Sequence, residues 1–367
     1  MTSPVLPIGF LPLVDAAPLI IAAEMDFARA EGLTLDLRRA TSWSSLRDMV
    51  TFGQVVAAHM LSPMPIAAAL GLGGAGAPLA AVSVLSTNGQ IVGVSPKLAA
   101  RMQNNGFAFG FDNATAAGIA LMGAADGPLR IGVPFPFSMH AELLYYWLTS
   151  LGRPSPAVLD IRTVPPPLMT EALAACEIDA FCVGEPWGSM AVEDGAARLL
   201  LPGSAIWSDA PEKVLGVRAD LADMAPEMLS SLIRALHLAA NWLGDPSSLT
   251  IASEILCRPE YLDVPTEIID RALSGQLTVS PRGETRRVAR FLDFSMTTPD
   301  PVHASWIGGR LAKRLGLDRV QAEKAARDTF RTDLHRRALL AIPGFTEAAA
   351  HQSRFSNGQT FNPIASD

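Results

Sequence analysis

Residue types that carry out catalysis are scattered along this chain without the spacing that catalytic motifs require. None of the three cysteines, Cys176, Cys182 and Cys257, has the close pairing of a zinc-binding motif. The sequence also lacks the Ser/His/Asp elbow of a hydrolase and the loop that binds nucleotide phosphates. We therefore expect a protein that binds a ligand without being an enzyme and without a metal or other cofactor.

A glycine-rich run at residues 71–76, GLGGAG, loosely resembles the fingerprint of dinucleotide-binding proteins. That fingerprint follows a strand, and an acidic residue stands about 20 positions after it. Here the run follows a segment broken by proline, and no acidic partner is placed at that distance. The run therefore predicts a flexible surface or cleft loop.

Composition and charge exclude several classes of protein. A chain of 367 residues suggests roughly two domains. With 49% hydrophobic and 18% charged residues, it has the material for packed cores and little for a disordered chain. A formal charge of −7 and the absence of a dense Lys/Arg run argue against direct nucleic-acid binding.

The ends and the apolar runs of the sequence bear on its location. Residues 1–7 are short and uncharged, unlike a secretory leader. No apolar run reaches the ~18 to 20 residues that span a bilayer, and an odd number of cysteines fits reduced thiols better than disulfides. We expect a cytoplasmic protein without membrane insertion, or a periplasmic one if a leader has been removed.

The chain carries an internal repeat. Residues 7–10 match residues 130–133 at an offset of 123, and residues 35–38 match residues 159–162 at an offset of 124. A third apolar segment ends at Pro63 in the first copy and at Pro186 in the second, again 123 positions later. Matches at a nearly constant offset predict two lobes of similar fold.

Each copy has the pattern of a βαβαβ unit, with three short apolar strands separated by helices. Helical crossovers join parallel strands, so each lobe is expected to be an α/β unit with a parallel-type sheet flanked by helices. Ligands of such sheets bind at the strand-to-helix loops. The expected helices are 16–32, with Asp15 as its cap, 42–50, with Ser42 as its cap, 138–151 and 167–175.

Two segments, residues 80–95 and residues around 211–218, are expected to connect the lobes and form a hinge. The expected domains are residues 1–90 as the first part of lobe 1, residues 91–211 as lobe 2, and residues 212–367 as the return to lobe 1. Apolar spacing predicts helices in this last part, such as 226–243 and 321–340. The tail after Ile342 is expected to wrap around the protein, with a turn at Ser356-Asn357-Gly358.

Several short motifs follow one another along nearly the whole chain. They are GFLPL at 9–13 with Asp15 and Pro18, SW at 42–43, AHMLSPMP at 58–65, NGQ at 88–90, VGEPW at 183–187, PEKVLG at 211–216 and RPEY at 258–261. In this order they resemble the substrate-binding proteins for nitrate and bicarbonate of the NrtA and CmpA type, and in particular their leaderless relative, the nitrate sensor NasS. The resemblance implies the two-lobed, type II periplasmic-binding-protein-like fold, with the ligand cleft between the lobes.

The resemblance also implies an anion pocket formed by Trp43, Gln90, His140 and Lys213. Two of these residues begin predicted helices, and the other two lie at the predicted crossings between the lobes. Both lobes would therefore contribute to one pocket. Other residues are expected to line its edge or the hinge, and these are Asp15, Gly89, Glu185 and Trp187, whereas His59 is expected to be a core histidine.

The four side chains suit nitrate or nitrite, whose oxygens accept hydrogen bonds and which have no proton to donate. Lys213 would neutralise the anion as the only charge in the pocket, and Trp43, Gln90 and His140 would donate hydrogen bonds. In the bicarbonate branch of the family a carboxylate replaces the lysine, so Lys213 favours nitrate or nitrite. Replacing Lys213 with alanine is expected to abolish binding and to leave the fold intact.

The resemblance to NasS implies a cytoplasmic sensor in nitrate assimilation and signal transduction. Anion binding would close the lobes and release a NasT-like RNA-binding antiterminator that is held in the absence of nitrate. One alternative is the substrate-binding component of a nitrate ABC importer. A second is an enzyme similar to the thiamine pyrimidine synthases that share this fold, although their iron-binding histidine cluster is not evident here.

Overall fold

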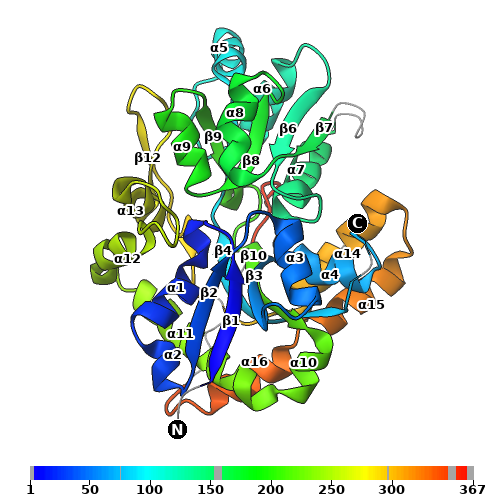
Figure 1. Ribbon diagram of the computed structural model, residues 1–367. Helices are drawn as coiled ribbons and strands as arrows, with labels where there is room; N and C mark the ends of the chain where they lie inside the picture. The colour runs from blue at the N-terminus through cyan, green and yellow to red at the C-terminus, as the bar shows by residue number, and fades with distance from the viewer. Residues whose placement is uncertain (1–3, 75, 153–158, 296, 346–352, 362–367) are drawn as a thin grey trace.

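The computed structural model describes residues 4–74, 76–152, 159–295, 297–345 and 353–361, and these form two α/β lobes, one above the other in Figure 1. In this part of the chain, lobe 1 contains a mixed sheet of order β13-β4-β10-β3-β1-β2, and lobe 2 a sheet of order β7-β6-β8-β5-β9. The predicted fold class is therefore confirmed. The lobe 1 strands are β1 Val5–Phe10, β2 Thr34–Arg39, β3 Ala57–Leu61, β4 Leu79–Asn88, β10 Pro211–Arg218 and β13 Leu292–Asp293, and those of lobe 2 are β5 Gln90–Val94, β6 Leu129–Val133, β7 Leu159–Thr163, β8 Ala180–Gly184 and β9 Arg198–Pro202.

Helices flank both sheets, and a two-stranded ribbon of β11 (Gln276–Thr278) and β12 (Thr285–Arg287) lies beside lobe 2 (Figure 1). Within the described residues, none of the helices is both long and apolar enough to cross a membrane. The lobe 2 α-helices are α5 Pro96–Asn104, α6 Ala114–Gly123, α7 Met139–Ser150, α8 Met169–Ala174 and α9 Trp187–Glu193. The other α-helices are α1 Ala17–Glu24, α2 Phe27–Ala30, α3 Trp43–Thr51, α4 Pro63–Ala69, α10 Ala219–Met224, α11 Pro226–Leu243, α12 Leu249–Leu256, α13 Thr266–Ser274, α14 Pro301–Leu315, α15 Arg319–Thr329 and α16 Thr332–Leu340. Short 3-10 helices are η1 Val14–Ala16, η3 Pro166–Leu168, η4 Gly203–Ala205 and η5 Pro246–Ser248.

The internal repeat is confirmed by the strand pairing of the two lobes. Strand β1 pairs in parallel with β2 and β3, and β6 pairs in the same way with β7 and β8. Ile8 lies opposite Leu37 and Ala57, and Ile131, 123 positions later, lies opposite Ile161 and Ala180. Each parallel trio is then extended by antiparallel strands, which are β10, β4 and β13 in lobe 1 and β5 and β9 in lobe 2. The βαβαβ pattern did not predict these added strands.

Several predicted helices are present, and two of them are divided. Helix α3 is capped by Ser42, whose Oγ accepts a hydrogen bond from the Ser45 amide at 3.1 Å. The helix predicted for 16–32 breaks into α1 and α2 around Asp26, whose φ of +60° is left-handed and cannot continue a helix. The helix predicted for 321–340 breaks into α15 and α16 at Phe330, which forms a β-bridge with Ala81. The predicted cap of the first helix is wrong, because Asp15 caps nothing.

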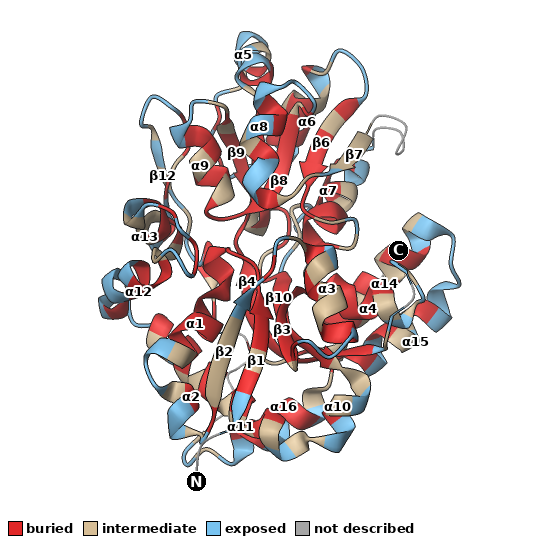
Figure 2. Cartoon of the chain, viewed as in Figure 1, coloured by how far each residue is buried: buried red, intermediate tan, exposed pale blue. Residues whose placement is uncertain are grey.

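The two connections between the lobes lie side by side. Asn88 and Gly89 join β4 to β5, and both have positive φ angles, of 60° and 84°. The chain returns over residues 203–210, where Ala210 O accepts a hydrogen bond from the Asn88 amide at 2.9 Å. The return was expected around residues 211–218, but these form β10, which lies inside the lobe 1 sheet between β4 and β3. Figure 2 shows that the central strands of both sheets are mostly buried, whereas β2 and β7 are more exposed. Asn88 and Ala210 of the connections are buried as well.

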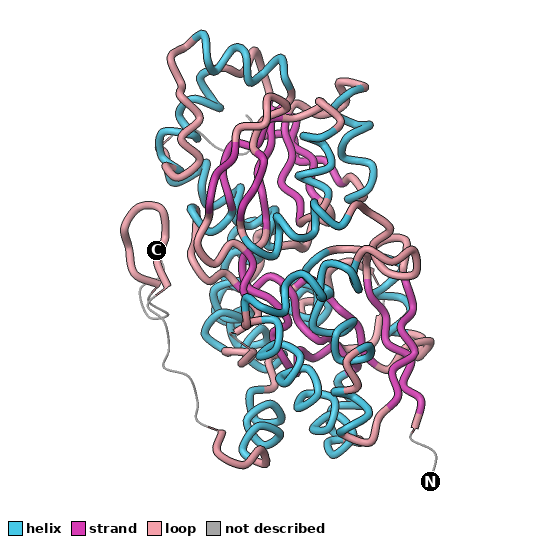
Figure 3. Tube along the Cα trace, turned by 90° about the vertical axis from the view of Figure 1, so that its left-hand side faces the viewer, coloured by secondary structure: helices cyan, strands magenta, loops and turns pink. Residues whose placement is uncertain are grey.

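Part of the C-terminal tail packs against the return connection and both lobes, as the side view in Figure 3 shows for its looped end. We call this contact the aromatic clasp, formed by Tyr146 of α7, Trp207, Trp306 of α14, Phe355 and Phe361. Phe355 lies 4.6 Å from Tyr146 and Phe361 lies 5.0 Å from Trp207, and the rings of Trp207 and Trp306 are 4.5 Å apart, measured between centroids. The tail turns at residues 356–357, as predicted; its residues 346–352 and 362–367, like Ala75 of the glycine run, lie outside the described part.

Candidate anion site

The four residues of the predicted pocket meet in one buried cluster between the lobes. Trp43 begins α3 and Lys213 lies in β10 of lobe 1, whereas Gln90 begins β5 and His140 lies in the first turn of α7 in lobe 2. Each is at most 2% exposed to solvent. The Lys213 ammonium lies 5.5 Å from the centroid of a Trp43 ring. The structure therefore brings these four side chains together.

Two carboxylates share this space with Lys213. Its ammonium donates to Oδ2 of Asp15 at 2.5 Å and to Oε1 of Glu212 at 2.7 Å. Glu212 also accepts a hydrogen bond from the Gln90 amide, and its Oε1 lies 3.2 Å from Nδ1 of His140. The expectation that Lys213 would be the only charge in the pocket is therefore wrong. A charge of the opposite sign stands on each side of it.

Glu212 was missed because adjacent residues of a regular strand point to opposite faces of the sheet. With Lys213 facing the pocket, Glu212 would face away from it. In the structure, however, the pairing of β10 with β4 shifts register on both sides of Lys213. Such an irregularity redirects side chains, and here both contact the site. The one available signal was a pair of adjacent charges at the start of an otherwise apolar strand.

His59 of β3 supports the site from inside lobe 1. Its Nε2 lies 2.9 Å from Oδ1 of Asp15, and its ring centroid lies 5.8 Å from that of Trp43. The residue is fully buried, as expected for a core histidine, but it contacts a residue of the site. Lys213 donates a hydrogen bond to one oxygen of Asp15, and His59 lies beside the other.

Burial and neighbouring charges set the protonation of the site cluster, which we define as Asp15, Trp43, His59, Gln90, His140, Glu212 and Lys213. Burial lowers the pKa of His140 to about 4, an effect that Lys213 strengthens and Glu212 opposes, and burial also lowers the pKa of His59. Burial alone would raise the pKa of Asp15, but Lys213 and His59 together hold it well below its usual range. The pKa of Lys213 is raised, because Asp15 and Glu212 outweigh the effect of burial. Near neutral pH, Lys213 is therefore charged and both imidazoles are neutral.

Several polar atoms of the cluster have no hydrogen-bond partner among the described residues. They include Nε1 of Trp43, both ring nitrogens of His140 and Oε1 of Gln90. An unpaired buried polar group costs about 1–3 kcal/mol, and such groups are rare in folded proteins. Here they gather around one ammonium group, as expected of a site for a small polar ligand. The Trp43 indole can donate a hydrogen bond to such a ligand, whereas the Gln90 oxygen can only accept one. In contrast, the described residues include no group of three or more His, Cys, Asp or Glu placed to hold a metal ion.

The other predicted residues lie at the edge of the cluster. Gly89 lies at the first connection, where a Cβ would stand 2.8 Å from Cδ1 of Leu292. The Glu185 carboxylate accepts two hydrogen bonds from Ser189 rather than contacting the four pocket residues. Trp187 donates from Nε1 to Pro12 O at 3.0 Å. The backbone carbonyl of Glu185 also accepts a hydrogen bond from the Val14 amide at 2.8 Å, so both residues link lobe 2 to the lobe 1 segment that carries Asp15.

Sequence reasoning also missed Gly203. A Cβ at this position would lie 2.5 Å from Oε1 of Gln90 and 3.1 Å from its Cβ. The return connection can therefore pass directly over Gln90 only because residue 203 has no side chain. This residue had no distinguishing signal in the sequence, since the contact joins segments more than 100 positions apart.

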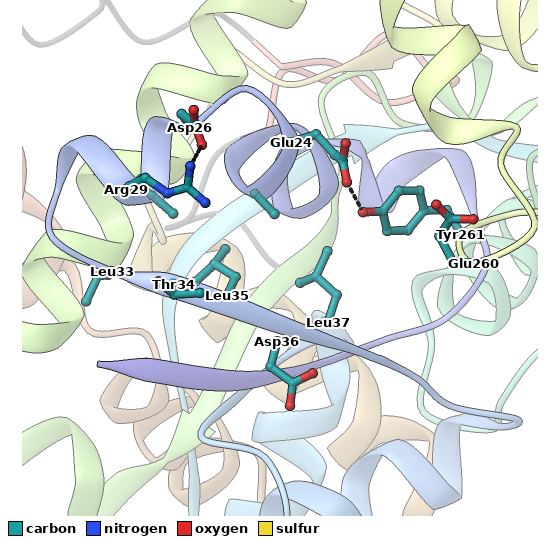
Figure 4. A pocket seen from close by; sticks show the side chains of 12 residues that line it. Glu24, Asp26, Arg29, Leu33, Thr34, Leu35, Asp36, Leu37, Glu260 and Tyr261 are labelled. Carbon is teal, nitrogen blue, oxygen red and sulfur yellow. Dashed lines mark hydrogen bonds and ion pairs between the residues drawn. The ribbon is translucent and has the colours of Figure 1, made fainter. Parts of the chain in front are cut away.

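Besides a cavity on lobe 2 beside Lys97, Arg101 and Asp179, two cavities lie away from the charged cluster. One, of about 350 Å³, lies between the lobes and is lined by Leu13 and Arg39 of lobe 1 and by Pro166, Pro167 and Trp187 of lobe 2, among others. The other, of about 300 Å³, lies on the outside of lobe 1 (Figure 4).

Acidic side chains of the outer cavity are already paired. In Figure 4, Glu24 accepts a hydrogen bond from the Tyr261 hydroxyl at 2.5 Å, and Asp26 binds Arg29 at 3.0 Å. Glu24 also binds Arg258 at 2.6 Å. The RPEY motif at 258–261 therefore attaches its loop to α1. It contributes to the fold of lobe 1 and not to the anion site.

Comparison with known proteins gives consistent matches over most of the chain. Residues 2–257 match the model of the NMT1-like family. The nitrate/nitrite binding protein NrtA of Synechococcus elongatus is 30% identical over 377 residues, an alignment that covers 97% of this chain and 83% of that protein. The nitrate import ATP-binding protein NrtC of Synechocystis is 31% identical over 316 residues, which cover 84% of this chain and 46% of that protein. The chain thus spans about half the length of the NrtC-type relatives that it matches.

The fold matches solved structures as well. The periplasmic nitrate-binding protein NrtA from Synechocystis superposes with a TM-score of 0.87 at 25% sequence identity, and the match covers 98% of this chain and 95% of that one. These findings confirm the resemblance to NrtA-type proteins that the ordered motifs predicted.

Proposed function

The chain belongs to the NMT1-like family, and on this premise we propose that it binds nitrate or nitrite between its two lobes, as a binding protein and not an enzyme. One observation carries the proposal. The buried and unpartnered Nε1 of Trp43 and Nε2 of His140 lie in the same cluster as the Lys213 ammonium. The relatives named as nitrate-binding proteins support the choice of anion.

The site residues have distinct roles in this proposal. Lys213 attracts the anion, and the Trp43 indole donates one hydrogen bond to it. Gln90 and His140 contribute from lobe 2, so binding draws the lobes together. Hydrogen bonds that involve a charged group contribute about 1.5–3 kcal/mol each. One such bond and several neutral ones, at about 0.5–1.5 kcal/mol each, supply much of the ~8 kcal/mol of a micromolar complex.

Asp15 and Glu212 position Lys213 and limit its charge. The two carboxylates take two of the three ammonium protons, so one direction remains for a ligand. A site of this kind favours a small ligand with a single charge. It disfavours sulfate or phosphate, whose second charge would face two carboxylates.

We extend the proposal to a cytoplasmic nitrate sensor that holds a NasT-like RNA-binding antiterminator without nitrate and releases it with nitrate. Closing the lobes on an anion changes the surface that a partner contacts, and the coupling is reciprocal, so partner binding in turn weakens nitrate binding. The formal charge of −7 supports a division of labour in which the partner alone contacts RNA.

The alternative is the substrate-binding component of a nitrate importer. Its support comes from the relatives, one named as a nitrate import protein and one as a periplasmic nitrate-binding protein. Co-elution of the purified chain with the antiterminator, lost on adding nitrate, supports the sensor. Co-elution with a membrane permease instead would favour the importer.

The test of ligand binding is calorimetric titration with nitrate, nitrite, bicarbonate and chloride in a low-anion buffer. We expect micromolar binding of nitrate or nitrite and no heat from bicarbonate. Trp43→Phe keeps an aromatic ring and removes the N–H, and it is expected to weaken binding about tenfold, as for one lost hydrogen bond. Binding of bicarbonate alone, or of no anion, would contradict the proposal.

A further inference from the structure

The position of His140 fixes which of its nitrogens carries the proton. Its Nδ1 lies 3.2 Å from Oε1 of Glu212, and the residue is 1% exposed. A carboxylate can only accept a hydrogen bond, and a neutral imidazole carries one proton. The contact does not have hydrogen-bond geometry, but a lone pair on Nδ1 would be repelled by a carboxylate at this distance, so neutral His140 carries its proton on Nδ1. Its Nε2 then has a lone pair and no proton to donate.

The free nitrogen of His140 faces the centre of the site cluster. A Cβ placed on Gly184 would lie 3.9 Å from Nε2 of His140 and 3.7 Å from Oδ2 of Asp15, the oxygen that binds Lys213. Among the described residues, neither ring nitrogen has a partner in hydrogen-bond geometry, and Nδ1 is the one that lies beside a carboxylate. An anion held by Lys213 would thus meet a lone pair on His140, and two like partial charges repel each other.

The charges around His140 also oppose the binding of an anion. Glu212 and Lys213 face it from β10, Asp15 faces it from η1, and His59 of β3 stands behind Asp15. Two carboxylates and one ammonium sum to one negative charge. A bound nitrate would raise this to two in a place with almost no exposure to solvent, where charges are poorly screened.

We propose that the protein binds its anion together with one proton, which His140 takes up at Nε2. The inference rests on the proposed function. The proton comes from solvent, and no covalent bond to the anion forms or breaks. The resulting imidazolium donates from Nδ1 to Glu212 and from Nε2 to the anion, and it restores the net charge of the cluster to its value before binding.

The protonation of the free protein agrees with this scheme. Burial lowers the pKa of His140 to about 4, so the imidazole is neutral at pH 7 until an anion arrives. A bound anion beside Nε2 favours the imidazolium and raises this pKa. Lys213 cannot supply the charge instead, because it is already protonated and donates to both carboxylates.

Calorimetry in several buffers tests the proposal on the full chain. Nitrate is titrated at pH 7 in buffers with different ionisation enthalpies, and the slope of the observed heat against these enthalpies gives the protons taken up. We expect about one proton per nitrate. We also expect affinity to fall about tenfold per pH unit as pH rises between pH 5 and the pKa of His140 in the complex.

Two variants test whether His140 is the residue that takes up the proton. His140→Gln keeps an amide donor but cannot titrate, so its weaker nitrate binding is expected to take up no proton. His237→Gln changes a histidine of α11 outside the cluster and is expected to keep the uptake of one. If His140→Gln does not bind, the ring nitrogen resonances of His140 in the wild-type protein, with and without nitrate at pH 7, report the same charge change directly.

The outcomes separate the inference from the proposed function. Nitrate binding without proton uptake, or a His140 ring that stays neutral in the complex, would overturn the inference and leave the proposed function standing. Failure of both nitrate and nitrite to bind between pH 5 and pH 8 would overturn both.

Discussion

The two lobes share three parallel strands in the same register, but they contribute different chemistry to the site between them. The charged members of the site cluster, Asp15, Glu212 and Lys213, all come from lobe 1. Lobe 2 adds Gln90 and His140, which are polar and neutral near pH 7. Lobe 1 therefore carries a charged half-site before the lobes meet, and lobe 2 completes it with groups whose contribution depends on closure.

The chemical difference between the lobes comes from positions at which the two copies of the repeat carry different residues. Ser138, 123 positions after Asp15, caps α7 by accepting from the Ala141 amide at 3.2 Å. Asp15 caps no helix, and its carboxylate binds His59 and Lys213 instead. The repeated positions thus build the scaffold, and the site depends on a residue that departs from its counterpart.

The largest expected effect comes from removing the charge at the centre of lobe 1. Lys213→Met leaves Asp15 and Glu212 buried without their cation, and breaking a buried ion pair costs about 3–5 kcal/mol. We therefore expect urea denaturation to show a drop of this size in the free energy of unfolding, together with loss of nitrate binding. This replaces the expectation that alanine at this position would leave the fold unaffected.

Lobe 2 provides the control for that prediction. Arg162 pairs with Asp160 at 2.7 Å on the surface, with both side chains about 40% exposed. Because exposed ion pairs contribute little, Arg162→Met is expected to cost less than about 1 kcal/mol. Equal losses in the two variants would contradict the view that the buried charges of lobe 1 make the difference.

A smaller effect is expected at the end of the third strand of each repeat. Lobe 1 has Ser62 there, which donates to Pro211 O at 2.6 Å, and lobe 2 has Glu185, 123 positions later. Burial raises the pKa of Glu185 to about 7, although hydrogen bonds from Ser189 oppose this. A carboxyl with a raised pKa stabilises the fold below its unfolded pKa of 4.5 and loses this contribution as pH rises through about 7.

We therefore expect the wild-type protein to lose stability between pH 4.5 and pH 7 relative to Glu185→Gln, by up to about 3 kcal/mol. Thermal or urea unfolding of the two proteins across this range measures the difference. Neither serine nor alanine titrates, so Ser62→Ala serves as the lobe 1 control. Its difference in stability from the wild-type protein should not vary with pH. Parallel curves for Glu185→Gln and wild type would refute the prediction.

The smallest expected effect concerns a feature that the two lobes share. Gly9 of β1 and Gly132 of β6 are repeat counterparts, and each allows a side chain from a neighbouring segment to pack on the strand. A Cβ on Gly9 would lie 2.5 Å from Cδ1 of Leu46, and one on Gly132 would lie 2.8 Å from Cδ1 of Ile178. Overpacking of this kind costs about 1–3 kcal/mol, so Gly9→Ala and Gly132→Ala should destabilise the protein by similar amounts.

Gly123→Ala is the matched control for these two variants, because a Cβ there meets nothing within 4 Å and the residue ends α6. It is expected to be neutral or slightly stabilising in denaturant unfolding. A loss in one repeat and none in the other would show that the two lobes do not pack by the same rule.

The parallel core of each lobe could be predicted from the sequence because its information is local. Apolar segments at a constant offset mark β1 to β3 and β6 to β8, and Ser42 and Ser138 mark helix starts by the chemistry of their hydroxyl groups. The antiparallel strands could not be predicted in this way. Strand β10 inserts between β3 and β4, which precede it by more than 100 residues, and no local pattern records that pairing.

The residues of the candidate site likewise fall into those that could be predicted from the sequence and those that could not. The family motifs placed Trp43, Gln90, His140 and Lys213, which the fold brings together. The role of Asp15 could not be read from its position, since an aspartate before a helix ordinarily predicts a cap. Glu212 depended on a shift of register in β10, and Gly203 on a contact across the return connection.

The aromatic clasp gives this protein a built-in optical signal. Trp207 lies on the connection that returns from lobe 2, Trp306 lies on α14, and the centroids of their rings are 4.5 Å apart. Two indoles at this separation couple their electronic transitions, and the sign and size of the resulting near-ultraviolet circular dichroism depend on the angle between the rings. A change in the angle between these two rings therefore alters the spectrum of the unlabelled protein.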